Sequence, residues 1–130
     1  RTVRYDGKEN VDTSDAKDLE IPMAVLVNES SYSAAEFFAA ALQEYGAAIV
    51  VGEKTVGKGY FQTTHRLSDG SAVSLSIGKY FTPKGVSLAE TGVTPDLLVP
   101  VEEETAAGIY YGTLEPEEDP QLQAAVNQLK

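Results

Sequence analysis

Residues 22–52 read PMAVLVNESSYSAAEFFAAALQEYGAAIVVG, and this stretch decides the fold. Residues 22–27 form a short, continuous apolar run, which is typical of a strand buried on both faces. Over residues 34–45 bulky apolar side chains recur at helical spacing and Gly46 follows, which predicts an amphipathic helix. The apolar run over 48–51 predicts a second buried strand. This order of elements indicates two parallel strands and an α/β fold.

A hairpin is predicted downstream of this unit. Residues 60–67 and 71–81 flank the turn Ser68-Asp69-Gly70, in which glycine can take a positive φ. Within residues 73–78 apolar side chains alternate with serine and glycine. We therefore expect one face of this strand in the core, and an opposite face small enough to leave room for a long side chain.

Four further segments complete the predicted secondary structure. Residues 2–5 alternate as in a strand, and residues 97–99 form a short apolar strand after a turn. Residues 120–129 have apolar side chains on one side of a predicted helix. The acidic segment 102–119 is expected to be partly mobile.

The composition restricts the possible functions. With 130 residues, of which 42% are hydrophobic, the chain is expected to form one domain, residues 1–130. Its net charge of −10 would repel nucleic acid and anionic membranes, so neither is expected as a partner. The absence of cysteine excludes thiol nucleophiles, thiolate metal sites and disulfides. The sequence lacks an initial Met and starts in an apparent strand, so it is expected to belong to a longer chain.

Residues 30–36, SSYSAAE, place a serine between a buried strand and a helix. At such a turn the hydroxyl faces outward, and the amides of the helix N-terminus are unpaired. Ser33 is therefore a candidate nucleophile, with its own amide and that of Ala34 as candidate oxyanion donors. Ser33 and Glu36 also match a capping box, so a purely structural N-cap is the alternative on this motif alone.

Residues 57–59, Gly-Lys-Gly, form the second candidate site together with Gln62. The two glycines allow a close backbone approach to another segment, although an isolated Lys58 of this kind is usually just solvated. A phosphate-binding loop is excluded, because Gly59 stands where Ser or Thr must bind magnesium. A Ser-His-Asp triad would have to use His65, the single histidine, which lies in a predicted strand. Otherwise a lysine can activate the serine, provided that burial keeps part of it unprotonated.

Together these motifs resemble the C-terminal processing, or tail-specific, peptidases over residues 22–99. The turn at 31–36 matches the family's S-A-S-A-S-E-like segment, and residues 52–62, GEKTVGKGYFQ, match its G-E-x-T-x-G-K-G-x-x-Q block. Three later motifs follow in the family's order, LSDGS at 67–71, YFTPKG at 80–85 and GVTPD at 92–96. The departures are Tyr32 and Ala35, where the family usually has Ala and Ser, and Glu44, where Asp is common.

The resemblance implies a serine endopeptidase that cuts proteins or peptides near their C-terminus, without cofactor or metal. Ser33 would be the nucleophile, Lys58 its base, Gln62 the residue that orients Lys58, and Ala34 an oxyanion-hole donor. The implied fold is a set of α/β layers similar to the crotonase and Clp peptidase class, truncated at the N-terminal side. The intact parent would be extracytoplasmic and would add an upstream PDZ domain and a second oxyanion donor. Glu44 is interpreted as a solvated helix residue.

Two alternatives stay open. The first is a non-catalytic piece of this fold that acts as a structural or interaction module. These 130 residues alone are not expected to work as a protease, and their uncovered apolar surface is expected to cause self-association, as a homo-oligomer or by strand exchange. The second is an acyl-CoA enzyme of the crotonase type, in which Ser33 and Lys58 would have no role.

Overall fold

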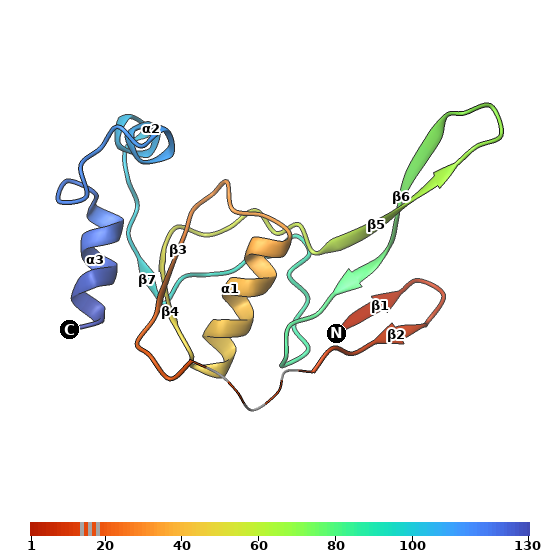
Figure 1. The fold of residues 1–130 in the computed structure, drawn as a ribbon, viewed down its shortest axis with the longest axis horizontal. Helices are drawn as coiled ribbons and strands as arrows, with labels where there is room; N and C mark the ends of the chain where they lie inside the picture. The colour runs from red at the N-terminus through yellow and green to blue at the C-terminus, as the bar shows by residue number, and fades with distance from the viewer. Residues whose placement is uncertain (14, 16, 18) are drawn as a thin grey trace.

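The computed structural model describes residues 1–13, 15, 17 and 19–130. They form two sheets and three helices, which confirms the predicted α/β class (Figure 1). One sheet is antiparallel with the order β2-β1-β6-β5, and the other is parallel with the order β3-β4-β7. None of the described helices is long and apolar enough to cross a bilayer. The elements are β1 (Thr2–Arg4), β2 (Glu9–Asn10), β3 (Ala24–Val27), α1 (Ala34–Tyr45), β4 (Ile49–Gly52), β5 (Tyr60–Arg66), β6 (Ala72–Tyr80), β7 (Leu97–Leu98), α2 (Glu103–Tyr111) and α3 (Pro120–Gln128).

The parallel sheet lies between α1 and α3 (Figure 1). Val50 is fully buried and packs with Ala39 and Ala40 of α1 in the core cluster. Val51 is also fully buried and, because successive strand side chains point to opposite faces, lies on the side covered by α3. The strand over 48–51 is therefore buried on both faces, as predicted.

The same prediction is wrong for β3. Leu26 is 42% exposed, and only Val27 of this strand is buried. The reason is that β3 is an edge strand of the parallel sheet within the described residues, so it has one strand neighbour where β4 has two.

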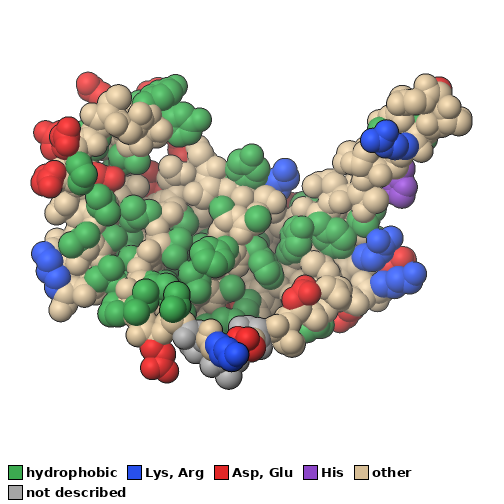
Figure 2. All heavy atoms as spheres, in the orientation of Figure 1, with side chains coloured by type: hydrophobic (Ala, Val, Ile, Leu, Met, Phe, Trp, Pro, Cys, Tyr) green, Lys and Arg blue, Asp and Glu red, His purple; other side chains and the backbone are tan. Residues whose placement is uncertain are grey.

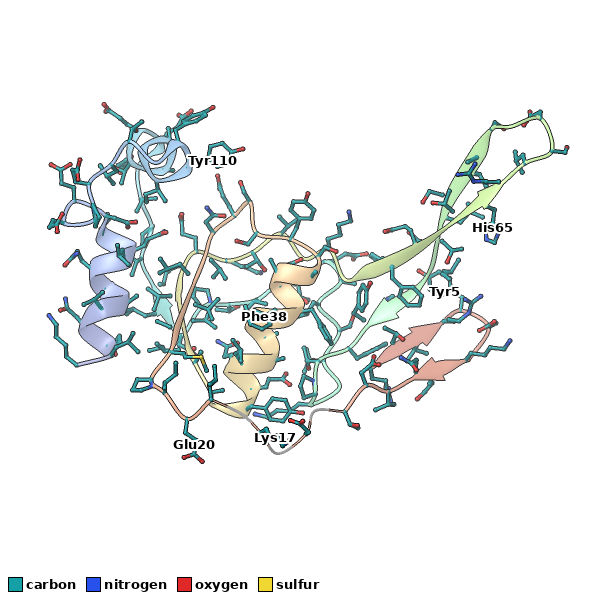
Figure 3. All side chains as sticks on the ribbon, viewed as in Figure 1. Tyr5, Lys17, Glu20, Phe38, His65 and Tyr110 are labelled. Atoms are coloured by element: carbon teal, nitrogen blue, oxygen red, sulfur yellow. The ribbon has the colours of Figure 1, made fainter. Side chains whose placement is uncertain are left out.

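Helix α1 has the predicted bounds and ends at Gly46, which adopts the left-handed conformation with φ 68°. Its Phe37 ring lies 5.7 Å from the ring of Tyr80, so the helix also contacts the antiparallel sheet. Two bulky side chains expected on its apolar side, Phe38 and Tyr45, are exposed instead, and Figure 3 shows Phe38 on the open side of the helix.

The predicted hairpin is confirmed, with Gly70 at φ 87° in its turn. The prediction that one face of β6 lies in the core is wrong, since Val73 and Leu75 are 40% and 49% exposed. The physical reason is visible in Figure 1, where the outer half of β5 and β6 extends away from the body of the molecule. The small face leaves no free space at Gly78, because a Cβ there would lie 2.2 Å from the Val3 carbonyl oxygen.

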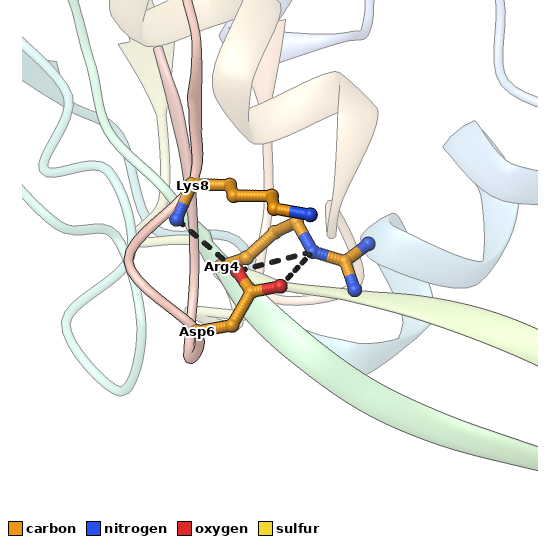
Figure 4. A network of polar contacts seen from close by, with 3 residues as sticks. All are labelled: Arg4, Asp6 and Lys8. Atoms are coloured by element: carbon orange, nitrogen blue, oxygen red, sulfur yellow. Dashed lines mark hydrogen bonds and ion pairs between the residues drawn. The ribbon is translucent and has the colours of Figure 1, made fainter.

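The strand predicted over 2–5 is present as β1, and its turn to β2 is closed by Asp6 (Figure 4). Asp6 accepts hydrogen bonds from the Lys8 amide, at 3.1 Å, and from the Arg4 side chain. The Lys8 amide first, and the nearby Arg4 charge after it, lower the pKa of Asp6 below its usual value.

The acidic segment 102–119 differs from its prediction, because it contains helix α2. No residue of this helix is buried. An unburied helix needs no apolar face, so its sequence has no apolar periodicity from which the helix could be predicted. Helix α3 follows as predicted, with Asp119 accepting from the amides of Gln121 and Leu122 as its N-cap. Figure 2 shows acidic side chains around α2, whereas Lys and Arg gather over the antiparallel sheet.

The interpretation of Glu44 as a solvated residue is also wrong. Its carboxylate accepts hydrogen bonds from the Thr82 hydroxyl, at 2.6 Å, and from the Lys84 amide, at 2.8 Å. Thr82 is 2% exposed, so its hydroxyl has little access to water. Glu44 therefore fixes the turn at 82–85 against the C-terminal half of α1.

Replacing Glu44 with Ala is expected to lower the free energy of unfolding by about 1–3 kcal/mol, because it leaves the buried Thr82 hydroxyl without its acceptor. Urea denaturation of the chain measures this change. The matched control is Glu104→Ala, on the exposed surface of α2. Equal stability of the two variants would contradict the assigned role of Glu44.

Candidate functional site

The turn between β3 and α1 holds Ser33 in a strained backbone conformation. Its φ is 59° and its ψ is −118°, and it is one of two non-glycine residues with positive φ in the described chain. Such conformations are costly and persist only where surrounding contacts enforce them. Sharp, strained strand-to-helix turns of this kind expose the nucleophilic serine in α/β-hydrolases. Ser33 thus lies between β3 and α1 as the sequence predicted, while its role as nucleophile stays a prediction. Its backbone conformation needs an explanation.

The explanation is a buried carboxylate, that of Glu36. Its side chain is 0% exposed and accepts four hydrogen bonds. Oε2 accepts from the amides of Ser33, at 2.8 Å, and Lys58, at 2.9 Å. Oε1 accepts from the Thr55 hydroxyl, at 2.5 Å, and the Gly57 amide, at 2.6 Å. Since a carboxylate offers about four acceptor positions, this buried charge is fully satisfied.

Sequence reasoning identified only a local role for Glu36. The amide of Ser33 does bind its side chain as in a capping box, but the other three donors come from the loop at 55–58. The available signals were a Ser-x-x-Glu turn and a glycine-rich loop that lies 21 residues or more further along the chain. The contact that joins the turn and the loop depends on the folded chain and could not be deduced from spacing.

The Gly-Lys-Gly loop is packed closely against residues 88–93, as its two glycines suggested. A Cβ on Gly57 would lie 2.9 Å from a backbone nitrogen of this segment, and one on Gly59 would lie 2.2 Å from another. Thr55 adds a further link, because its hydroxyl accepts a hydrogen bond from the Val93 amide at 2.8 Å. The main chain around Lys58 is therefore held on two sides, by Glu36 and by residues 88–93.

A surface contact supports the same loop where it enters β5. The Tyr60 hydroxyl donates to the Glu90 carboxylate at 2.9 Å, while the Glu90 amide binds the Gly57 carbonyl at 2.8 Å. The hydrogen bond to Glu90 raises the pKa of Tyr60 above its usual value. Lys79 lies over the same ring, with Nζ 5.4 Å from the centroid of Tyr60.

The Lys58 side chain is exposed, and its Nζ lies 5.2 Å from the centroid of the Tyr32 ring. Among the described residues its ammonium makes no hydrogen bond to Ser33, and the burial expected of a neutral lysine is not present. Gln62 makes no hydrogen bond to Lys58 in the described part of the chain, and its Nε2 donates instead to the Ser76 hydroxyl at 3.2 Å. The structure thus brings the main chains of Ser33 and Lys58 together without a hydrogen bond between their side chains.

The prediction that the Ser33 amide is an oxyanion donor is wrong. The amide of Ser33 is occupied by the Glu36 carboxylate and cannot point at a substrate. The amide of Ala34, at the start of α1, has no hydrogen-bond partner within the described part of the chain. Ala34 therefore keeps an amide that is available as a donor at this turn.

His65 lies apart from this site. It is exposed on the outer half of β5, opposite Val73, and Figure 3 shows it on the projecting arm away from α1. A triad built on His65 and Ser33 is not supported by this arrangement.

A groove of about 470 Å³ adjoins the serine turn. Its walls include Ser30 from the turn, Glu53 after β4, and Ala106 and Tyr110 of α2. In the described residues, no three His, Asp or Glu side chains form a group that could hold a metal ion.

Fold and site define an α/β protein whose strand-to-helix serine turn resembles that of hydrolases. A model of peptidase family S41 matches residues 1–99, so the chain belongs to peptidase family S41. The family resemblance inferred from the sequence motifs is thereby confirmed.

The relatives of the chain are C-terminal processing proteases. It is 41% identical over 110 residues to the carboxyl-terminal-processing protease of Picosynechococcus sp., covering 85% of this chain and 25% of that protein. It is 42% identical over 91 residues to carboxyl-terminal-processing peptidase 2, chloroplastic, of Arabidopsis thaliana, covering 70% and 18%. A solved photosystem II D1 C-terminal processing protease matches with a TM-score of 0.70 and 37% identity, covering 76% and 26%. The chain spans about a quarter or less of these relatives.

Replacing Thr55 with Val is expected to lower the free energy of unfolding by about 1–3 kcal/mol, because the isosteric side chain cannot bind Glu36 or the Val93 amide. Thr55→Ser is the matched control, since it retains the hydroxyl and both hydrogen bonds. Urea denaturation measures both variants. If Val and Ser substitutions cost the same, the hydroxyl does not contribute as inferred.

Replacing Glu90 with Gln is expected to lower the pKa of Tyr60 toward its ordinary value near 10, because the acceptor carboxylate is removed. A raised pKa in the folded state stabilises the fold below the unfolded-state pKa, and this contribution is lost as pH rises through the folded-state value. An NMR titration of labelled tyrosine measures the shift, with Glu104→Gln as control. An unchanged Tyr60 titration would exclude the contact in solution.

Proposed function

We propose that the chain is the C-terminal part of the catalytic domain of a serine endopeptidase of the C-terminal processing type. Its substrates would be proteins or peptides, cut near the C-terminus by Ser33 with Lys58 as base. The observation that supports this proposal most is the Glu36 carboxylate, whose Oε2 binds the main-chain amides of both Ser33 and Lys58. The membership of peptidase family S41 supports the reaction class.

In the proposed reaction, neutral Lys58 accepts the proton of the Ser33 hydroxyl while Oγ attacks the peptide carbonyl carbon. The Ala34 amide stabilises the negative oxygen of the tetrahedral intermediate. Collapse of this intermediate breaks the C–N bond, and the departing amine takes the proton from Lys58. Water, deprotonated by Lys58, then hydrolyses the acyl-enzyme and restores Ser33. Gln62 would orient Lys58 after exchanging its bond to Ser76.

The remaining parts of the proposal concern the parent protein. A PDZ domain upstream would deliver the substrate, and a second oxyanion donor would come from outside this sequence. We place the parent in an extracytoplasmic compartment, and the relatives that support this are chloroplastic proteins of Arabidopsis thaliana and Tetradesmus obliquus.

A non-catalytic module is the second candidate function. It is favoured by the position of the Lys58 ammonium, which lies against Tyr32 without a hydrogen bond to Ser33. Exposed apolar side chains on α1, such as Phe38 and Tyr45, would suit a role in self-association.

Ser33→Ala or Lys58→Ala in the full-length protein is expected to lower kcat by at least about 10³-fold, because either change removes the nucleophile or its base. Lys54→Ala is the matched control for Lys58, since it lies exposed in the same loop, and His65→Ala tests the triad. Cleavage of a peptide with a labelled C-terminus measures all four variants. Near-normal turnover with Ser33→Ala or Lys58→Ala would exclude the proposed dyad.

A further inference from the structure

The Tyr32 ring is the partner of the Lys58 ammonium in this structure. Nζ lies 5.2 Å from the ring centroid, within the roughly 6 Å range of a cation–π contact. The ring itself is 57% exposed, so a substrate can reach it. In the described residues no carboxylate forms an ion pair with Lys58, so the aromatic face is the group that holds its charge in place.

The main chain beneath these side chains is fixed by Glu36. Its Oε2 accepts from the Ser33 amide at 2.8 Å and from the Lys58 amide at 2.9 Å. Because the two amides share this acceptor, the distance between their nitrogens cannot exceed the sum of these two hydrogen-bond lengths. Because a lysine side chain has four rotatable bonds, rotation alone can carry Nζ from the ring toward Ser33, the residue next to Tyr32.

We propose that Tyr32 is a positioning residue that holds protonated Lys58 on its ring when no substrate is bound, so that Lys58 makes no hydrogen bond to Ser33. This inference rests on the proposed Ser33–Lys58 dyad and adds a residue that regulates when Lys58 can reach Ser33. The ring attracts an ammonium and has no such attraction for a neutral amine, whereas Ser33 needs the neutral amine. A substrate chain that packs on the exposed ring competes with Lys58 and releases it.

The contact itself is tested by NMR of the protein labelled with ¹³C and ¹⁵N lysine. A ring face shifts nearby protons upfield, so the ε-methylene protons of Lys58 are expected upfield of those of Lys54 and Lys84. Tyr32→Leu should abolish this shift and Tyr32→Phe should preserve it. Lys79, which lies over Tyr60, is an internal control whose shift should persist in both variants. A Lys58 signal that is unshifted, or unaffected by Tyr32→Leu, overturns the proposal.

The consequence for catalysis is tested by kcat/KM of the full-length protein at constant pH and salt. Tyr32→Leu is expected to raise kcat/KM about two- to fivefold, the factor that an exposed cation–π contact represents. Tyr32→Phe should behave like the unchanged protein, because it keeps the ring. Tyr45→Leu, an exposed tyrosine of α1, is the matched control for removing an aromatic side chain. An unchanged or lower value for Tyr32→Leu overturns the proposal.

The two measurements separate this inference from the proposed function. Loss of activity in Lys58→Ala, combined with no gain in Tyr32→Leu, rejects the role of Tyr32 and retains the dyad. Full activity in Lys58→Ala rejects the dyad and with it the catalytic role of Tyr32, whatever the NMR spectrum shows.

Discussion

The carboxylate of Glu36 is the group on which the candidate site depends. A buried charge is tolerated only when hydrogen bonds replace its lost water, and here the four donors come from the serine turn and the lysine loop. Because Oε2 binds the amides of Ser33 and Lys58 at once, the strained turn and the loop cannot separate without leaving this charge unpaired. A positive φ at Ser33 persists because this network maintains it.

The same network explains which parts of the site are rigid and which can move. Main-chain atoms at Ser33 and Lys58 are held directly, and the Lys58 loop is also packed through Gly57 and Gly59 on residues 88–93. The side chains of Lys58 and Gln62 reach outward, one to Tyr32 and the other to Ser76 on β6. The structure thus combines a main chain held by hydrogen bonds with side chains that are not held to Ser33, which would suit the proposed role of Lys58 as a base that approaches Ser33 when substrate binds.

Most elements of the fold were predictable because they depend on local periodicity. Helix α1 has the bounds that its apolar spacing and Gly46 predicted, and the hairpin formed around Gly70. Burial was less predictable, since it depends on neighbouring elements. Val73 is exposed because its end of the hairpin extends from the body, and Glu44 is engaged because the turn at 82–85 lies against α1.

The sequence by itself determined the α/β class, the family and the two candidate residues Ser33 and Lys58, because strand and helix periods and ordered motifs are properties of the chain alone. Only the tertiary structure decided what Glu36 does, that the Ser33 amide is occupied, and that Lys58 lies against Tyr32. The physical reason is that a buried carboxylate takes its donors from whatever backbone folding brings within hydrogen-bond distance, and Lys58 is 22 residues from Glu36 along the chain.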